Sequence, residues 1–188
     1  MTEPLDPELN ATFAEHLGHD GLQRLLGGSI AYLPDSLRGC APQRLNNIVG
    51  IFSVARQRLG RQLDQIGQVA PRVLHAVVLG GSYCSDPLAQ AYLGGVLASA
   101  RTESGRDDRG ARMLRLIDGL SIYQLRTHYL LYASVRELFR EAPPRLDSPD
   151  DRALLQVFLP HAGFMPAMEL RAEELRQPQL FAQVFQGL

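Results

Sequence analysis

The segment from Val73 to Ala100 contains 28 residues but only one formally charged side chain, that of Asp86. Glycines and polar residues at 80–87 divide it into two apolar arms. An aspartate directly before a proline is typical of a helix start, because its carboxylate accepts hydrogen bonds from the first free N–H groups and proline fits the first helical position. The segment therefore predicts a close-packed helical hairpin at 71–102, with Asp86 as the cap of its second arm.

Small residues are frequent in that second arm, and Gly94 and Gly95 lie near its middle. A glycine inside a helix costs roughly 0.5–1 kcal/mol relative to alanine, so two in succession need a structural reason. Without side chains at these positions, the backbone of another helix could approach closely. We therefore expect Gly94 and Gly95 to serve helix packing.

Helix signals recur along the rest of the chain, whereas strand signals are almost absent. Pro7 and Pro149 each follow a capping residue, and no turn dipeptide separates two alternating apolar runs. The sequence predicts an all-α fold, a compact bundle of seven to nine helices. The expected helices span residues 7–17, 21–33, 42–68, 71–80, 87–102, 108–118, 121–141, 149–160 and 166–186.

The domain organisation follows from length and from the breaks near the C-terminus. We expect residues 1–160 to form a single α-helical domain, because a chain of 188 residues is long enough for one core. Residues 161–188 are expected to form a C-terminal helical tail with an apolar edge that needs a covering surface. This tail would dock in cis or at an oligomer interface.

Two polar side chains fall inside apolar faces of the expected helices. Arg56 projects into the apolar stripe of the 42–68 helix, where a carboxylate, backbone carbonyls or solvent must receive its guanidinium group. His128 lies in the apolar arc of the 121–141 helix, which we expect to be a central core helix. Both residues are interpreted as structural. An anion site at Arg56 and a catalytic role for His128 are the alternatives.

Composition excludes several chemistries. All 19 basic residues are arginines, so no lysine exists for a P-loop or for Schiff-base catalysis. The histidines and the two cysteines, Cys40 and Cys84, show no metal-ligand spacing, and no cofactor or metal is expected. Cys84 precedes a helix start, where a thiol pKa can fall, but a simply buried thiol is the favoured interpretation. No nucleophile motif is present, so we predict a protein that is not an enzyme.

The cysteines and the first residues also bear on the cellular compartment. Two cysteines are too few for a disulfide framework, and the first ten residues, with their acids and prolines, do not resemble a signal peptide. No window approaches the roughly 20 unbroken apolar residues of a membrane helix. We therefore expect a cytoplasmic protein with no transmembrane segment.

A group of arginines is the main candidate for binding an anion or a nucleic acid. Several recur at every third residue on the expected 108–118 helix, where guanidinium groups could contact phosphates. Asp107, Asp108 and Asp118 dilute the charge, and no aromatic side chains are interleaved for base stacking, so a solvated helix face is favoured. The candidate contacts are Arg101, Arg106, Arg109, Arg112 and Arg115.

The order of features in residues 56–102 is similar to that of a known family. A long helix leads to one that begins at Pro71, a short turn with an acid follows, and the next helix ends Val96-Leu97-Ala98-Ser99-Ala100. A Leu-Ser element at 120–121 then opens another long helix. Over residues 45–140 the chain resembles the abortive-infection alpha (Abi-alpha) family, bacterial helical proteins associated with phage defence. The resemblance implies a helical fold and a defence context, and it implies no site residues.

Three functions remain open from the sequence. The first is a non-enzymatic cytosolic protein that acts through contacts with a protein partner or with further copies of itself, in bacterial phage defence. The second is an arginine-based nucleic-acid-binding protein. The third is a membrane-perturbing toxic effector built on the hairpin, although its arms, of 10 and 16 residues, are too short to span a bilayer.

Overall fold

The chain forms two compact units, Met1–Gly119 and Leu120–Leu188. The computed structural model describes residues 7–18, 20–141, 147–154, 158 and 160–185. The division differs from the boundary expected between residues 160 and 161, because the tail packs with the helix that follows Leu120 and belongs to the same unit.

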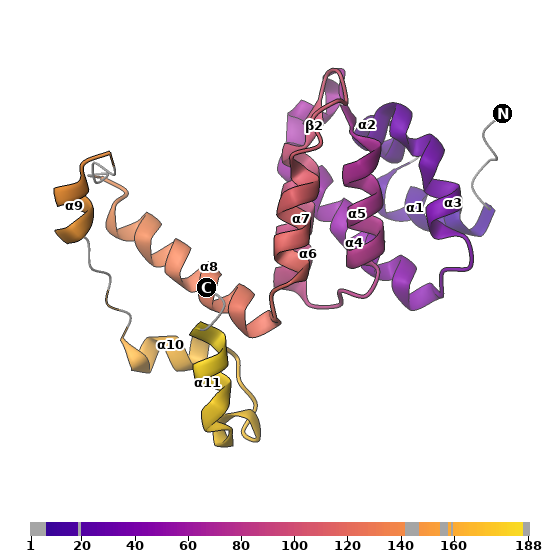
Figure 1. Ribbon diagram of the computed structural model, residues 1–188. Helices are drawn as coiled ribbons and strands as arrows, with labels where there is room; N and C mark the ends of the chain where they lie inside the picture. Colours follow the sequence, from indigo (N-terminus) through magenta and orange to yellow (C-terminus); the bar gives the residue numbers. More distant parts are fainter. Residues whose placement is uncertain (1–6, 19, 142–146, 155–157, 159, 186–188) are drawn as a thin grey trace. The chain divides into compact units, whose positions relative to one another are not determined.

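The first unit consists of helices joined by short loops, with one pair of two-residue strands (Figure 1). The strands pair antiparallel, with Gln68 opposite Thr102 and Val69 opposite Arg101. The predominance of packed helices confirms the all-α fold class. In chain order the elements are α1 (Pro7–Leu17), α2 (Gly21–Leu26), η1 (Gly27–Tyr32), α3 (Leu33–Leu37), α4 (Pro42–Leu59), η2 (Gly60–Asp64), β1 (Gln68–Val69), α5 (Pro71–Gly81), α6 (Pro87–Ser99), β2 (Arg101–Thr102) and α7 (Gly110–Asp118).

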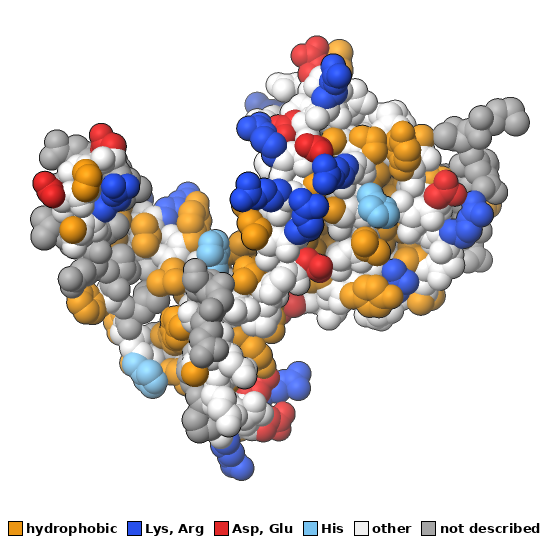
Figure 2. Space-filling view, in the orientation of Figure 1, with side chains coloured by type: hydrophobic (Ala, Val, Ile, Leu, Met, Phe, Trp, Pro, Cys, Tyr) orange, Lys and Arg blue, Asp and Glu red, His pale blue; other side chains and the backbone are white. Residues whose placement is uncertain are grey.

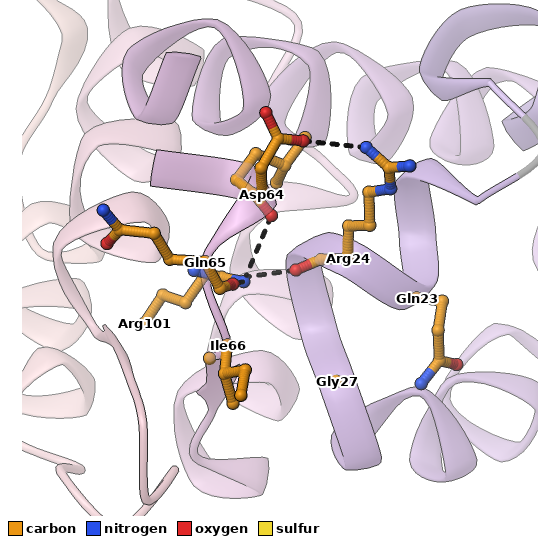
Figure 3. A pocket seen from close by; sticks show the side chains of 9 residues that line it. Gln23, Arg24, Gly27, Asp64, Gln65, Ile66 and Arg101 are labelled. Atoms are coloured by element: carbon orange, nitrogen blue, oxygen red, sulfur yellow. Dashed lines mark hydrogen bonds and ion pairs between the residues drawn. The ribbon is translucent and has the colours of Figure 1, made fainter. Parts of the chain in front are cut away.

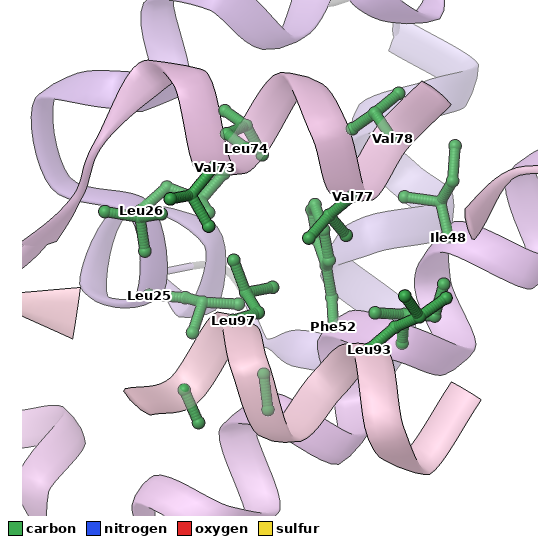
Figure 4. Packing of buried hydrophobic residues seen from close by; sticks show 14 of the residues in the cluster. Leu25, Leu26, Ile48, Phe52, Val73, Leu74, Val77, Val78, Leu93 and Leu97 are labelled. Atoms are coloured by element: carbon green, nitrogen blue, oxygen red, sulfur yellow. The ribbon is translucent and has the colours of Figure 1, made fainter. Parts of the chain in front are cut away.

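The hairpin expected at 71–102 is formed by α5 and α6. The carboxylate of Asp86 caps α6, accepting hydrogen bonds from the N–H groups of Leu88 at 2.8 Å and Ala89 at 3.1 Å. Both arms contribute to the core, where side chains of α6 meet those of α5 and α4 (Figure 4). The central members of this core are Ile48, Phe52, Val73, Leu74, Val77, Leu93 and Leu97.

Gly94 lies where α6 packs against α4. A Cβ atom added at Gly94 would lie 2.7 Å from the Cβ atom of Val54 and 2.8 Å from the carbonyl oxygen of Ile51. Cβ atoms do not approach other atoms so closely, so glycine is required for this backbone approach. At Gly95 the nearest atom belongs to the end of the Arg58 side chain, at 3.1 Å, which can move aside. The packing role expected for the pair therefore belongs to Gly94.

α4 ends earlier than the 42–68 helix expected from the sequence. The residue that follows it, Gly60, adopts a φ of +49°, and the tighter turn of η2 begins there. Ile66, which would have belonged to the end of a helix that ran to residue 68, is 86% exposed. Arg56 lies exposed in the last turn of α4, and its Nη1 donates a hydrogen bond to the carbonyl of His16 at 3.1 Å. A backbone carbonyl of α1 thus receives the guanidinium group.

The second unit begins with α8, which starts at a capping box. The Ser121 hydroxyl accepts a hydrogen bond from the N–H of Gln124 at 3.3 Å, and the Gln124 side chain accepts one from the N–H of Ser121 at 2.9 Å. The elements of this unit are α8 (Ile122–Leu138), α9 (Pro149–Leu154), α10 (His161–Ala167), η3 (Glu174–Arg176) and α11 (Pro178–Phe185).

α8 is not the central core helix that its apolar arc predicted. Along its length only Leu125 and Thr127 are buried. His128, expected to be a core histidine, is exposed. The apolar arc is present in the sequence of α8, but packing covers only its first half.

The tail covers that first half in cis. Arg126 donates from Nη1 to the carbonyl of Met168 at 2.7 Å, and its Nη2 lies 2.8 Å from a carboxylate oxygen of Glu169. The Tyr123 hydroxyl donates to the carboxylate of Glu174. Met168 is fully buried. The described residues of the tail thus pack against α8 of the same chain.

Replacing Gly94 with alanine should destabilise the first unit, although alanine is the better helix former. The added methyl group would press on the α4 backbone, and such overpacking costs about 1–3 kcal/mol. Gly95→Ala is the matched control and should leave the free energy of unfolding unchanged or raise it by up to about 1 kcal/mol. Urea denaturation followed by circular dichroism measures both. Equal stabilities of the two variants would contradict the close approach at Gly94.

Candidate functional site

The five candidate arginines differ in the partners that the fold gives them. Arg101 binds backbone carbonyls, and Arg109 binds an aspartate. An arginine contacts an external anion with the N–H groups that its own chain leaves unused, so these partners decide which residues stay candidates. Those with no side-chain hydrogen bond or ion pair among the described residues are Arg106, Arg112 and Arg115.

Arg101, the first residue of β2, holds several segments of the first unit together (Figure 3). Its Nε donates to the carbonyl of Arg24 at 3.0 Å, and its Nη1 donates to that of Gln62 at 3.1 Å. Nη2 donates to the carbonyls of Leu63 at 3.4 Å and Gln65 at 2.6 Å. Four of the five guanidinium N–H groups are thus engaged. Burial lowers the pKa of Arg101, but arginine stays charged. The geometry assigns Arg101 a structural role.

A pocket of about 490 Å³ lies beside these carbonyl contacts. Its charged residues are already paired: Arg24 and Asp64 form an ion pair of 2.8 Å, and Arg101 is held by carbonyls. The pocket therefore offers a ligand no unpaired charge. Its lining residues are Gln23, Arg24, Gly27, Leu63, Asp64, Gln65, Ile66, Gly67 and Arg101.

Two ion pairs organise the loop before α7. Arg109 donates from Nε and Nη2 to the two carboxylate oxygens of Asp107, at 2.9 and 2.6 Å, and its backbone N–H donates to the same group. These hydrogen bonds lower the pKa of Asp107 from 3.8 to about 2 and raise the pKa of Arg109. Arg72 of α5 pairs with Asp108 at 2.9 Å. Two of the acids that dilute the positive charge in the sequence are thereby neutralised.

α7 has one side against the core and one side outward. Ala111 and Leu114 are buried, and α7 packs on α5 and α6. Figure 2 shows arginine side chains gathered over α7 and the loop before it. The exposed residues on the outward side of α7 are Arg112, Met113, Arg115 and Leu116. Together with the exposed Arg106 of the preceding loop, Arg112 and Arg115 form what we call the α7 arginine cluster.

The second half of α8 presents large apolar side chains that sequence reasoning had assigned to a core. The signal against a core position was the charge of the last turn, where Arg136 is followed by Glu137. We call these side chains the α8 apolar face. Its residues and their exposed fractions are Tyr129 (48%), Tyr132 (57%), Val135 (36%) and Leu138 (61%).

Three further features that the sequence raised are a reactive cysteine, a metal site and a membrane-spanning helix. Burial raises the pKa of the Cys84 thiol, and the nearby carboxylate of Asp86 adds to the rise, so the helix start beside it does not activate a nucleophile. Within the described ranges, no group of three or more His, Cys, Asp or Glu residues is placed to hold a metal ion. The described helices include none that is both long and apolar enough to cross a membrane.

Comparison of the chain with protein-family models, with curated proteins and with solved structures finds no match in any of the three. The contacts and exposures of its own residues therefore carry the functional argument.

Arg101 should matter for stability far more than the exposed arginines of α7. Arg101→Ala removes four hydrogen bonds to carbonyls of α2, η2 and the residue after η2. Hydrogen bonds to charged groups are worth about 1.5–3 kcal/mol each, but these four are partly exposed. We therefore expect the free energy of unfolding to fall by about 2–3 kcal/mol. Arg112→Ala should change the free energy of unfolding by less than about 0.5 kcal/mol. Urea denaturation compares the two variants, and a similar small effect from both would contradict the structural role of Arg101.

The Asp107–Arg109 pair predicts a specific pH dependence. The folded-state pKa of Asp107 is depressed, so the favourable interaction is complete above its ordinary pKa of 3.8 and is lost as pH falls through about 2. At about pH 3 the Asp107 carboxylate should therefore be mostly ionised in the native chain and more protonated in Arg109→Gln, which keeps only the hydrogen bond from the backbone N–H. Carbon-13 NMR of the side-chain carboxyl measures this. Arg106→Gln is the control, and an identical titration in all three chains would contradict the pair.

Proposed function

We propose that the protein acts through contact with another protein chain, at the α8 apolar face. The observation that supports this is the exposure of two tyrosines, a valine and a leucine on consecutive turns of one helix. A contiguous set of large exposed apolar side chains is typical of a protein–protein contact surface. Tyrosine suits such a surface because its ring buries a large area while its hydroxyl group can remain hydrated.

The way α8 is packed supports the same proposal. Leu125, near the start of the helix, is 3% exposed because the tail covers it, whereas Tyr132, two turns further on the same side, is 57% exposed. Both belong to one apolar arc, so the change in burial reflects missing cover and not a change to polar side chains. The helix thus presents half of a core-like surface that a partner would complete.

A second copy of the chain is the occupant we propose for this face. An apolar surface is complementary to itself, because apolar side chains need no opposite charge on the other side. Two α8 helices packed around a two-fold axis would bring the same residues of each chain together, and two-fold dimers are the commonest oligomers. The large tyrosines would fill the space between two helix backbones 8–10 Å apart, the usual interaxial distance.

The biological context proposed for this contact is bacterial phage defence. It is supported by the order of features over residues 45–140 that resembles the abortive-infection alpha family. In this proposal the assembled form, and not the single chain, is the active one.

Removal of the α8 apolar face should abolish self-association. The double variant Tyr132→Gln/Leu138→Gln replaces two exposed side chains, so the fold of each chain should persist, as circular dichroism will show. Sedimentation velocity should give a dimer for the native chain and a monomer for the variant. In a bacterial host that expresses the chain, the native form should lower the efficiency of phage plating and the variant should restore it.

The matched control is Ile66→Gln/Leu79→Gln, which removes two exposed apolar side chains of the first unit, 86% and 61% exposed. This control should stay dimeric. A native chain that sediments as a monomer at its highest soluble concentration would overturn the proposal, and so would dimers that persist in the α8 variant. Dimers without any effect on plating would overturn the defence context alone.

A further inference from the structure

We propose that the α7 arginine cluster binds the phosphate backbone of a nucleic acid. Arg106, Arg112 and Arg115 are exposed and have no side-chain partner within the residues that the structure describes. Their donors are therefore available to an external anion, in contrast to those of Arg101 and Arg109.

The local charge is more positive than the sequence indicates. The stretch 103–118 holds four arginines and four acids, which cancel in a count. In the fold, however, Asp107 is held by Arg109 and Asp108 is held by Arg72 of α5. Of the other two acids, Glu103 lies exposed in the loop between β2 and α7, and Asp118 lies at the far end of α7, beside Gly80 of α5. The outward side of α7 thus presents three guanidinium groups, while two of the four carboxylates in the stretch are already paired with other arginines.

The shape of the surface favours an extended polyanion over a small anion. The three guanidinium groups lie on an outward helix side and on the preceding loop, and none of them lines the pocket beside Arg101. Arg112 and Arg115 are three residues apart, which places their Cβ atoms about 5–6 Å from each other on one side of the helix. Such a surface contacts successive phosphates weakly, one guanidinium group each, and gains affinity by releasing counterions.

A nucleic acid fits this surface better than an anionic membrane. A helix that binds a membrane surface inserts its apolar side by about 5–10 Å into the lipid. The apolar side of α7, with Ala111 and Leu114, faces the core. The outward side of α7 exposes two large apolar side chains, Met113 at 52% and Leu116 at 57%, and two are too few to form the continuous apolar face that such insertion needs. Phosphate contacts need no such insertion. Since phosphate contacts carry no sequence information, binding through them should be independent of base sequence.

The test compares two triple variants of equal charge. Arg106→Gln/Arg112→Gln/Arg115→Gln removes the cluster, and Arg61→Gln/Arg136→Gln/Arg176→Gln removes three exposed arginines elsewhere. Each takes the formal net charge from −1 to −4, which is −1 minus three, so long-range electrostatics are matched. Fluorescence anisotropy follows the binding of labelled single-stranded and double-stranded oligonucleotides of mixed sequence as the salt concentration is raised from a low value. Liposomes with and without phosphatidylserine are tested in parallel.

The native chain and the control variant should bind oligonucleotide at low salt, with affinity that falls as salt rises. Loss of the cluster should weaken binding at least tenfold and reduce the slope of log affinity against log salt by about 2 to 3, since each phosphate contact contributes about 0.7–0.9. Absence of oligonucleotide binding by the native chain would overturn the proposal. Equal weakening in both variants would overturn it too, because net charge would then be the cause. Binding to phosphatidylserine liposomes alone would assign the cluster to lipid headgroups instead.

Discussion

The close approach of α4 and α6 at Gly94 is the contact on which the rest of the first unit depends. α6 packs on α4, α5 and α7, so its distance from α4 sets the positions of the other two helices. Glycine costs helix propensity there, but the approach lets Leu93 and Leu97 reach the side chains of α4 and α5. The position of α7 and its arginines therefore depends on the backbone contact that Gly94 of α6 makes with α4.

The arginines show how tertiary structure divides residues of one type among different roles. Arg101, Arg109 and Arg112 lie within 12 residues, yet one binds four carbonyls, one binds a carboxylate and one faces solvent. The carbonyls that hold Arg101 belong to residues at least 36 positions away. Carbonyl oxygens at the C-terminal ends of helices such as α2 and η2 have no partner within their own helix. A guanidinium group is well suited to collect them because its five donors diverge in one plane.

The features that sequence reasoning predicts correctly are local ones. Asp86 caps the helix that begins after it, because the donors that it satisfies lie two and three residues away. The end of α4 was missed because Gly60 can continue a helix or take a positive φ, and only the packing of η2 selects the second. The role of Arg101 could not be predicted at all, since its partners are set by the fold and no local pattern encodes them.

α8 shows that an apolar arc in the sequence of a helix does not by itself ensure that the arc is buried. The pattern states that one arc of the helix is apolar, and this is correct. Burial additionally requires an element that covers the arc, and the tail covers it at Leu125 but leaves Tyr132 and Leu138 exposed. The interface proposed for α8 rests on this difference between an apolar arc and a covered one. The contacts proposed for the α7 surface are of the opposite kind, because contacts between arginine and phosphate weaken as salt rises, whereas apolar burial does not. Salt concentration therefore distinguishes the two surfaces within one chain.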